Sequence, residues 1–348
     1  MNMSSKALRT SSVDYRIASF GLGTAGCRIL SQLERNGVQL GKHHYASCTQ
    51  SDFDLISIKN RITIKLPLGG KISHRFVRGA AHAHTQQIER ALEGVDTIFL
   101  IAGLGGKVGS ALAPMIAEMA RERGVRCFSV VVMPFKFEKN KHFTAGVALK
   151  WIRRFSDGVI IVDNDEILER FPQAPLQESF ELIDKSLALA VSRLFGLADN
   201  AQGASLDMDK LLQVVASDGY SVLGTSGPKS DTPVGAVKGA IKCISKTVDP
   251  REAKKAIIFM AGDAKLSASD LTSAIGTIES ILGSNLSSVD YGYSSGGMVS
   301  SALLLASGFP ETKFDKYDPL GSILAGKEID FYPESSIEID LDKLENIE

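Results

Sequence analysis

The sequence has little of what defines several classes of protein. It has only four cysteines, which lie far apart without a C-x-x-C pair, so a disulfide framework and a zinc site of that spacing are excluded. No apolar run approaches the ~18–20 residues that span a bilayer. Residues 1–14 lack the apolar stretch of a signal peptide, and we expect them to form a disordered leader. These absences predict a cytoplasmic protein without direct membrane insertion.

An excess of charge of one sign is also missing from the whole chain. The 348 residues hold 39 Lys+Arg against 40 Asp+Glu, and a net charge of -1 argues against a dedicated nucleic-acid binder. The balance is uneven, however, because Glu311–Glu348 hold 11 acidic residues and 4 lysines, a net of -7, which leaves +6 for the remainder. The chain is therefore a basic body with an acidic tail.

Apolar β-rich runs alternate with helical patterns through the first half of the chain. Runs such as Thr97–Gly103 and Cys127–Met133 do not alternate with polar residues, so both faces of their sheet should be covered. This pattern predicts a doubly wound parallel α/β domain. Further strands are expected at Arg16–Leu22, His44–Thr49, Ile62–Leu66 and Gly158–Asp163, with helices at Ala25–Asn36, Gln86–Leu92, Ala111–Arg123 and Thr144–Phe155.

The length and the pattern predict two domains and a tail. We expect a first α/β domain over residues 15–175, a long helix and connector over 176–204, a smaller α+β domain over 205–309 and the acidic tail over 310–348. In the second domain a Gly/Ser/Pro-rich stretch, Gly219–Gly235, separates a short helix from the later elements. Those elements are expected as a strand at Ala256–Ala261, a helix at Ser267–Leu282 and strands at Ser288–Tyr293 and Met298–Ala306.

A first glycine loop, Gly21-Leu-Gly23-Thr-Ala-Gly26, leads from a predicted strand into a predicted helix. In this context G-x-G-x-x-G gives a tight turn and presents backbone amides to a phosphate. A dinucleotide site would also require an acid ~20 residues later to bind the ribose. The second strand instead ends Ala46-Ser47-Cys48-Thr49, which weakens the dinucleotide interpretation. The alternative is that these glycines serve only helix–strand packing.

A second glycine loop, residues 103–110, follows another predicted strand with the sequence GLGGKVGS. It is not a Walker A loop, which requires G-x-x-x-x-G-K-[ST]. Two strand–glycine–helix junctions at the same edge of a parallel sheet could hold a polyphosphate from two sides. The histidines His82 and His84 have no apparent third ligand, and no metal site is predicted from them.

The run IFLIAGLGGKVGSALAPMIAEMARERGVRCFSVVVMPFKFE resembles the signature stretch of the FtsZ/tubulin superfamily of GTP-binding, filament-forming proteins. There the pattern is approximately AGMGGGTGTGAAPVIAEIA, followed by a strand and PFxFE. The likeness extends from Arg16 to about Phe309 and is weaker in its second half. GLGTAGCRIL resembles the first phosphate loop of the family, and RFSDGVIIVDNDEIL its ribose and base loop. PLQESFELIDKSLALAV resembles the start of its long central helix.

The resemblance implies a GTP/GDP site whose residues can be carried over by position. The phosphates would lie on both glycine loops, Glu138 would reach the ribose, and Asn164 would lie beside the nucleotide. Phe180 would stack on the base, and Asp184, one helical turn later, would accept hydrogen bonds from the guanine edge. The phosphate positions are Gly21, Gly23, Thr24, Gly26, Gly105, Gly106, Lys107, Gly109 and Ser110. Without the resemblance, Phe180 would be taken as a core residue and Asp184 as a solvated one.

Several positions depart from the family pattern. Lys107 and Val108 stand where the family has Gly and Thr, so a cation enters the phosphate site and a hydroxyl near the terminal phosphate or Mg²⁺ is lost. The catalytic loop of the family, approximately N-x-D-x-x-D, is inserted by one subunit into the pocket of the next. Asp207 matches its first acid, but Lys210 occupies the second position, and a lysine cannot polarise water as a carboxylate does. Asp209 is the available substitute.

We therefore expect a divergent FtsZ/tubulin-like protein with weak or absent GTP hydrolysis that assembles head to tail into cytoskeletal or cell-division filaments. One alternative is a non-hydrolysing structural or regulatory paralogue that copolymerises with an active FtsZ-like relative. A second, less favoured, is a Rossmann-type dinucleotide-dependent enzyme. The terminal IEIDLDKLENIE is either an adaptor-docking peptide or a solubilising acidic tail.

Overall fold

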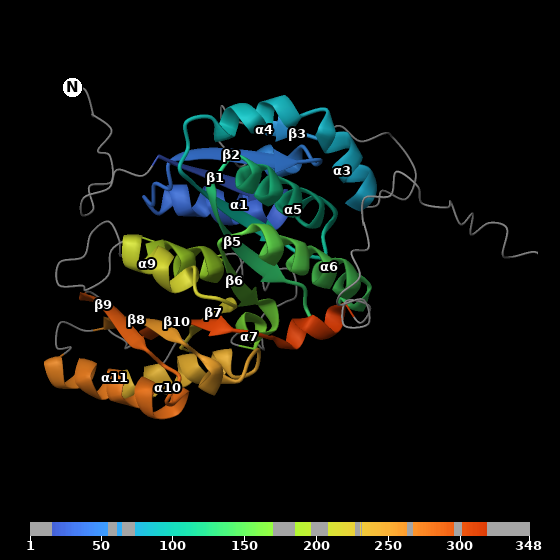
Figure 1. The fold of residues 1–348 in the computed structure, drawn as a ribbon. Helices are drawn as coiled ribbons and strands as arrows, with labels where there is room; N and C mark the ends of the chain where they lie inside the picture. Colours follow the sequence, from blue (N-terminus) through green and yellow to red (C-terminus); the bar gives the residue numbers. More distant parts are fainter. Residues whose placement is uncertain are drawn as a thin grey trace, which may run out of the picture.

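A single sheet organises the computed structural model of the chain. The structure describes residues 16–54, 61–64, 74–169, 185–195, 208–226, 230, 232–262, 267–295 and 301–318. Within these residues the strands form one 10-stranded sheet in the order β3-β2-β1-β4-β5-β6-β7-β10-β8-β9 (Figure 1). The strands are β1 Ile17–Leu22, β2 Lys42–Ser47, β3 Arg61–Thr63, β4 Thr97–Gly103, β5 Arg126–Met133, β6 Gly158–Asp163, β7 Tyr220–Thr225, β8 Lys255–Gly262, β9 Ser288–Ser295 and β10 Ser301–Phe309.

The first part of the sheet is wholly parallel. Every neighbouring pair from β3 to β7 runs in the same direction, which confirms the expected parallel α/β architecture. Strand β10 is antiparallel to both β7 and β8, and β9 is parallel to β8, so the complete sheet is mixed. The strands of the predicted second domain thus continue the first sheet, joined to it by two register pairs between β6 and β7. The proposed domain boundaries remain predictions.

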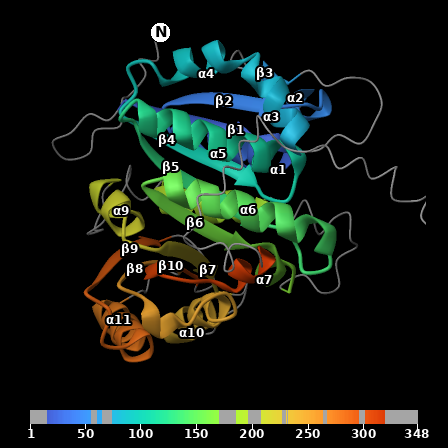
Figure 2. The same ribbon diagram turned by 45° about the vertical axis from the view of Figure 1, so that its right-hand side comes forward.

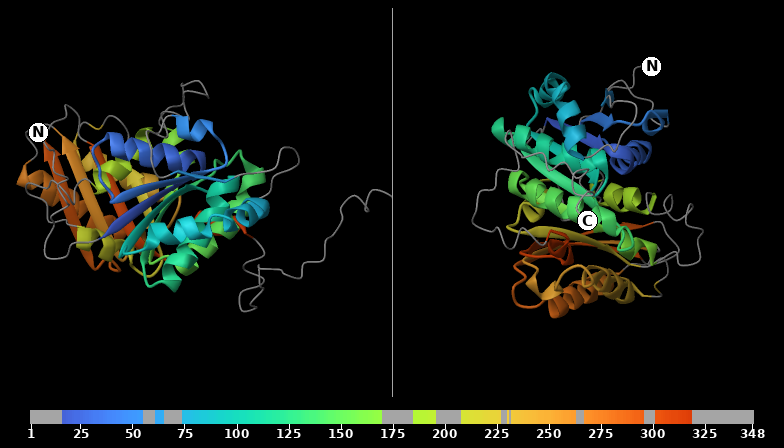
Figure 3. Two further views of the ribbon diagram at one scale, coloured as in Figure 1. Left: turned by 90° about the horizontal axis from the view of Figure 1, so that it is seen from above. Right: turned by 90° about the vertical axis from the view of Figure 1, so that its right-hand side faces the viewer.

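Helices cover both faces of the sheet, as the views from different sides make clear (Figure 2; Figure 3). Apolar residues of α3, α4, α5, α6, α10 and α11 form one buried cluster with one face of the strands, and those of α1, α2, α9 and residues 185–195 form another with the opposite face. The helices are α1 Gly23–Arg35, α2 Ser51–Asp54, α3 His74–His82, α4 Thr85–Leu92, α5 Lys107–Glu122, α6 Lys139–Phe155, α7 Asn164–Leu168, α9 Met208–Val215, α10 Pro233–Ile244 and α11 Ala268–Leu282, with residues 185–195 also helical.

Strand β4 explains why its sequence does not alternate between apolar and polar residues. Ile98 and Leu100 lie in the cluster on one face, while Phe99 and Ile101 lie in the cluster on the other. All four side chains are buried. A strand that is covered on both sides must be apolar at every position, so the continuous apolar run predicted its central place in the sheet.

The Gly/Ser/Pro-rich stretch Gly219–Gly235 contains two elements that the sequence pattern did not predict, strand β7 and the start of helix α10. Gly224 lies within β7, where a Cβ atom would come within 2.6 Å of the Ala240 carbonyl oxygen. The glycine therefore allows α10 to approach the sheet. Pro233 begins α10, and the Thr232 side chain caps it by accepting from the Gly235 N–H at 3.1 Å. These residues mark a strand and a helix start rather than a loop.

The first residues of the predicted acidic tail belong to the packed body. The short helix η2 (Lys313–Tyr317) lies against α6, where the Tyr317 ring stacks on His142 with a centroid separation of 3.8 Å. Lys150 pairs with Asp318 at 3.0 Å, and Arg153 donates to the Pro310 carbonyl at 2.9 Å. Residues 310–318, which begin the predicted acidic tail, thus pack against α6. The terminal IEIDLDKLENIE lies outside the described residues.

Within the parts of the chain that the structure describes, no helix combines the length and the apolar composition that a bilayer crossing requires.

Candidate functional site

The two glycine loops meet at the carboxyl edge of the sheet. Strands β1 and β4 are parallel neighbours, with Leu22 opposite Ala102, and each strand leads into its loop at that edge. A Cβ atom on Gly23 would lie 3.3 Å from the Val108 Cβ, so the two loops are in van der Waals contact. The carboxyl edge of a parallel sheet is where open α/β folds bind their ligands.

A cavity of about 420 Å³ opens beside this junction. Both glycine loops, the end of β2, the start of α6 and the start of α7 contribute to its wall. Of the thirteen nucleotide-site positions predicted from the sequence, this wall includes seven. The lining residues are Leu22, Gly23, Thr24, Ala25, Arg28, Ser47, Cys48, Thr49, Asp52, Gly103, Leu104, Gly106, Lys107, Val108, Gly109, Val132, Pro134, Phe135, Glu138, Lys141 and Asn164.

The glycines of the first loop have different tasks. Gly23 lines the cavity and has a φ of +68°, a backbone conformation that side chains other than glycine rarely adopt. Gly21 and Gly26 do not line it. A Cβ on Gly26 would lie 2.1 Å from the Ile101 carbonyl oxygen, and one on Gly21 would lie 2.8 Å from the Gly26 oxygen. These two glycines bring helix α1 against β1 and β4, as the packing alternative proposed.

The second loop is held by its own hydrogen bond and by close packing. Ser110 is buried, and its Oγ accepts from the Gly105 N–H at 2.8 Å, so this hydroxyl shapes the loop and does not line the cavity. Gly105 has a φ of +82° and packs against Lys141. A Cβ on Gly109 would lie 2.3 Å from the Gly103 oxygen.

Helix α5 begins at the cavity with its first turn open. Gly106 is the N-cap residue, and no side chain caps this end of the helix or places an acid in the first turn. Backbone amides of an uncapped helix start favour an anion. Lys107 lines the same wall and is exposed, whereas Val108 is 6% exposed and turns its side chain toward Gly23. The wall is therefore electropositive.

Asp52 is a cavity residue that the sequence search missed. It lies on the short helix α2, and its carboxylate is only 7% exposed. Its Oδ2 accepts from the Thr24 hydroxyl at 3.0 Å and from the Ser47 hydroxyl. The strand-like sequence ends at Thr49 without an acid, and the short helix α2 that follows brings Asp52 to the cavity. The network ties Thr24 of the first loop to the end of β2.

Glu138 and Lys141 form an ion pair at the start of α6, beside the second glycine loop. Glu138 is the N-cap residue of α6, and its Oε1 lies 2.5 Å from the Lys141 Nζ. Its Oε2 accepts from the Phe135 N–H at 3.2 Å. The Phe135 ring is buried and stacks on Phe137, which is 54% exposed. Glu138 thus lines the cavity with both carboxylate oxygens engaged, and its predicted contact with a ribose remains a prediction.

Asn164 lines the cavity with an unsatisfied side-chain oxygen. Its Oδ1 is buried and has no hydrogen-bond partner among the described residues. A buried oxygen without a donor costs roughly 1–3 kcal/mol, so this atom favours a ligand that donates a hydrogen bond. The residue begins α7 directly after β6. A ribose hydroxyl or a base N–H would satisfy it.

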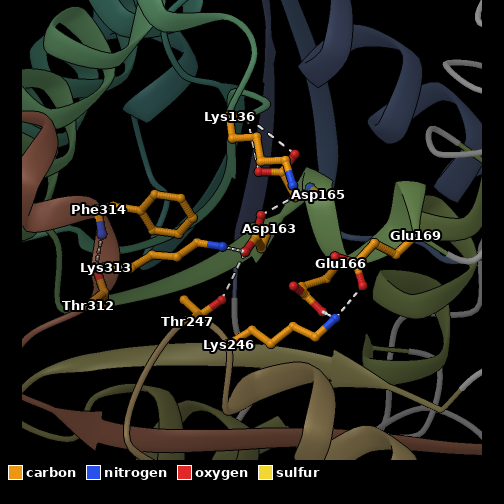
Figure 4. A network of polar contacts seen from close by, with 10 residues as sticks. All are labelled: Lys136, Asp163, Asp165, Glu166, Glu169, Lys246, Thr247, Thr312, Lys313 and Phe314. Carbon is orange, nitrogen blue, oxygen red and sulfur yellow. Dashed lines mark hydrogen bonds and ion pairs between the residues drawn. The ribbon is translucent and has the colours of Figure 1, made fainter.

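The residues on either side of Asn164 are anchored by a buried polar network (Figure 4). Asp163, 3% exposed, forms an ion pair with Lys313, and it accepts from the Thr247 hydroxyl and the Asp165 N–H, each at 3.0 Å. Asp165 in turn accepts from the Lys136 N–H at 3.0 Å. Elements that are distant in the sequence therefore fix the turn that carries Asn164.

A second part of the network follows α7. Lys246 pairs with Glu166 at 3.0 Å and with Glu169, and these bonds raise the pKa of Lys246 and lower that of Glu169 (Figure 4). Desolvation raises the pKa of the buried Asp165 carboxyl, and the neighbouring Asp163 raises it further. Desolvation likewise raises the pKa of Glu166. The acids are stabilised by cations from the segment after α10 and from η2.

Not every predicted site residue can be placed. Phe180, Asp184 and Asp207 lie outside the described residues. Asp209 is in the first turn of α9 and does not line the cavity of its own chain. Lys210, beside it, lies 3.7 Å from an Asp290 carboxylate oxygen on β9.

Comparison with known proteins gives a consistent result. The Tubulin/FtsZ family, GTPase domain, matches residues 16–171, which include both glycine loops and Asn164. Cell division protein FtsZ 1 of Pyrococcus horikoshii is 32% identical over 260 residues, covering 72% of this chain and 69% of the relative. Cell division protein FtsZ 2 of Methanocaldococcus jannaschii is 28% identical over 255 residues, covering 71% and 67%.

Solved structures share the fold. An empty FtsZ dimer from M. jannaschii superposes with a TM-score of 0.74 at 23% identity, covering 86% of this chain and 93% of that one. A GTPγS-bound protofilament of CetZ2 from Haloferax volcanii gives 0.71 at 20% identity, covering 89% and 99%. Because a relative at 32% identity covers more than two thirds of both chains and the family match spans the cavity, the chain belongs to the Tubulin/FtsZ family.

Proposed function

We propose that this chain binds guanine nucleotide in the cavity and assembles head to tail into filaments, with weak or absent hydrolysis. The observation that carries the proposal is the junction of both glycine loops around one cavity. The open start of helix α5 lines this cavity together with Asn164, whose buried oxygen has no donor among the described residues. The amides suit phosphates, and Asn164 suits a donor on the nucleoside. A dinucleotide-dependent enzyme is not supported, since the matching family is one of GTPases.

Assembly follows from the family and from the surface beside the cavity. CetZ2 is described as a protofilament, and the M. jannaschii FtsZ as a dimer. In this chain Phe137 and Phe143 flank Glu138 and Lys141 and are 54% and 45% exposed. Large exposed aromatic side chains are typical of contact surfaces. A second copy that covers them would also close the cavity from solvent.

Weak hydrolysis is proposed from Lys210. The resemblance places the second catalytic acid there, and its ammonium is near Asp290 of the same chain. A cation in this position supplies no general base. If hydrolysis is absent, a copolymer with an active relative becomes the alternative role. The candidate acids Asp207 and Asp209 remain proposals.

The test combines nucleotide identification, sedimentation and phosphate release on the purified full chain. We expect guanine nucleotide in the released ligand, GTP-dependent pelleting and little phosphate. Gly106→Val adds a branched side chain on the cavity wall, where φ is -79° and a Cβ meets only the Gly103 oxygen at 3.8 Å, so the fold should tolerate it. We expect nucleotide affinity to fall by roughly tenfold or more.

The matched control is Gly276→Ala in helix α11, where a Cβ meets nothing within 4 Å. It should bind as the unaltered chain does. Release of a nicotinamide nucleotide, or equal GTP affinity in both variants, would contradict the proposed site. Pelleting with no phosphate release would favour the non-hydrolysing role over an active polymer.

A further inference from the structure

Lys107 is a cation on the cavity wall. It is the first residue of α5, it is exposed, and among the described residues no carboxylate lies within ion-pair distance of its ammonium. By contrast, Lys141, which also lines the cavity, is already paired with Glu138. An unpaired ammonium beside helix-start amides is a phosphate-binding arrangement, since lysine binds phosphate as a point charge.

The oxygen ligands that Mg²⁺ requires are poorly represented at the same site. Mg²⁺ binds through one or two carboxylates together with substrate phosphates in octahedral geometry. Among the described residues, two carboxylates line the cavity. Glu138 pairs with Lys141 and accepts a hydrogen bond from the Phe135 N–H, and Asp52 accepts hydrogen bonds from the Thr24 and Ser47 hydroxyls. The described residues contain no group of three or more His, Cys, Asp or Glu placed to hold a metal.

The net charge of the lining side chains also favours phosphate binding by cationic side chains over binding through a metal ion. Three of the lining side chains are cationic, Arg28, Lys107 and Lys141, and two are anionic, Asp52 and Glu138. The wall therefore carries a net charge of +1, before the positive end of α5 is added. The aliphatic side chain of Val108, next to Lys107, offers no oxygen ligand and packs toward Gly23. The phosphate end of the cavity supplies positive charge rather than metal ligands.

We propose that the Lys107 ammonium neutralises the terminal phosphates in place of a divalent cation, so that nucleoside triphosphate binds this chain without Mg²⁺. The inference rests on the proposed function, because it concerns how the same cavity holds the nucleotide. On this proposal the chain binds nucleotide without a metal ion, and Lys107 is the residue that makes the binding independent of Mg²⁺.

The test is equilibrium binding of GTP to the full chain by titration calorimetry, in excess Mg²⁺ and in excess EDTA. We expect the Kd of the unaltered chain to change by less than about threefold between the two conditions. Loss of a charge-assisted hydrogen bond to a phosphate weakens binding by about tenfold or more, so we expect Lys107→Ala to weaken binding in EDTA by at least that factor. Lys107→Arg keeps the charge and should keep binding in EDTA.

Lys238→Ala is the matched control, because Lys238 is an exposed lysine on α10 that does not line the cavity. It should leave both Kd values unchanged. Binding of GTP to the unaltered chain only in Mg²⁺ would overturn the inference and leave the proposed function intact. Tighter binding by Lys107→Ala would also overturn it, since Lys107 would then obstruct the cavity. Absence of binding in both conditions would instead refute the proposed function.

Discussion

Gly26 allows a stringent test of how the first glycine loop is built. It lies in the first turns of α1, where an added Cβ would be 2.1 Å from the Ile101 carbonyl oxygen of β4. Ordinary van der Waals contact begins at about 3.4 Å, so Gly26→Ala forces α1 to move by more than about 1 Å. The oxygen belongs to a central strand and cannot rotate away. Residues of α1 that are fully buried, such as Leu30 and Leu33, would lose their packing.

The magnitude follows from two opposing effects. Alanine in place of glycine stabilises a helix interior by up to about 1 kcal/mol. Overpacking a core costs about 1–3 kcal/mol and more when the backbone must shift. We therefore expect Gly26→Ala to lower the free energy of unfolding by about 3 kcal/mol. Gly79→Ala in α3, where a Cβ meets nothing within 4 Å, is the matched control and should raise it by up to about 1 kcal/mol.

The assay is urea unfolding followed by circular dichroism and by the fluorescence of Trp151, the single tryptophan. Equal m-values in all three chains would show that the difference lies in stability. The reasoning would be refuted if the free energy of unfolding of Gly26→Ala lay within roughly 0.5 kcal/mol of that of the unaltered chain, a difference typical of neutral surface substitutions. In that case α1 would not depend on the close approach, and the loop geometry would need another cause.

Further predictions concern pH and the buried network. Burial lowers the pKa of His44 from 6.5 to about 4, with smaller effects of Lys42 and His43. The neutral ring therefore contributes stability above pH 6.5 that is lost as the pH falls toward 4, about 3 kcal/mol in all. His44→Phe retains the stacking on Phe20 and removes the titrating ring. Between pH 6.5 and 4 its free energy of unfolding, measured in urea, should therefore fall by about 3 kcal/mol less than that of the unaltered chain. The exposed control His82→Gln should show the same pH dependence as the unaltered chain. Lys313→Met leaves the Asp163 carboxylate buried without its ion pair and should cost about 1–3 kcal/mol, less than a fully buried pair because Lys313 is 33% exposed. Adding Asp163→Asn to Lys313→Met should recover part of the lost free energy of unfolding. If the losses of the two single variants simply add in the double variant, the proposed network is contradicted.

The network gives the C-terminal part of the chain a direct connection with the nucleotide cavity. Asp163 and Asp165 flank Asn164 in the sequence, and their partners come from the segment after α10, from η2 and from the loop before α6. A displacement of η2 would remove Lys313 from Asp163. The position of Asn164, which lines the cavity, thus depends on residues close to the acidic tail. This dependence gives Lys313→Met a second measurable consequence in nucleotide affinity.

The sequence by itself determined the parallel α/β class, both glycine loops and most of the first-half strands. These features depend on local patterns, namely apolar runs without alternation and glycines between a strand and a helix, so they are visible without tertiary contacts. It also placed Glu138, Asn164 and Lys107 at the site through resemblance to the family. It failed at β7, because a glycine that permits close packing has the same local signal as a glycine in a loop.

Only the tertiary structure decided which glycines line the cavity and which bring the helix to the sheet. Gly21, Gly23 and Gly26 share one motif, yet their surroundings differ because Ile101 and Val108 come from elsewhere in the chain. The same holds for Asp52, which α2 returns to the cavity, and for the tail segment that packs on α6. Steric contact and the pairing of buried charge act between residues distant in sequence. Local sequence therefore specifies most helices and strands, and the packing between them decides which residues line the cavity and which support the fold.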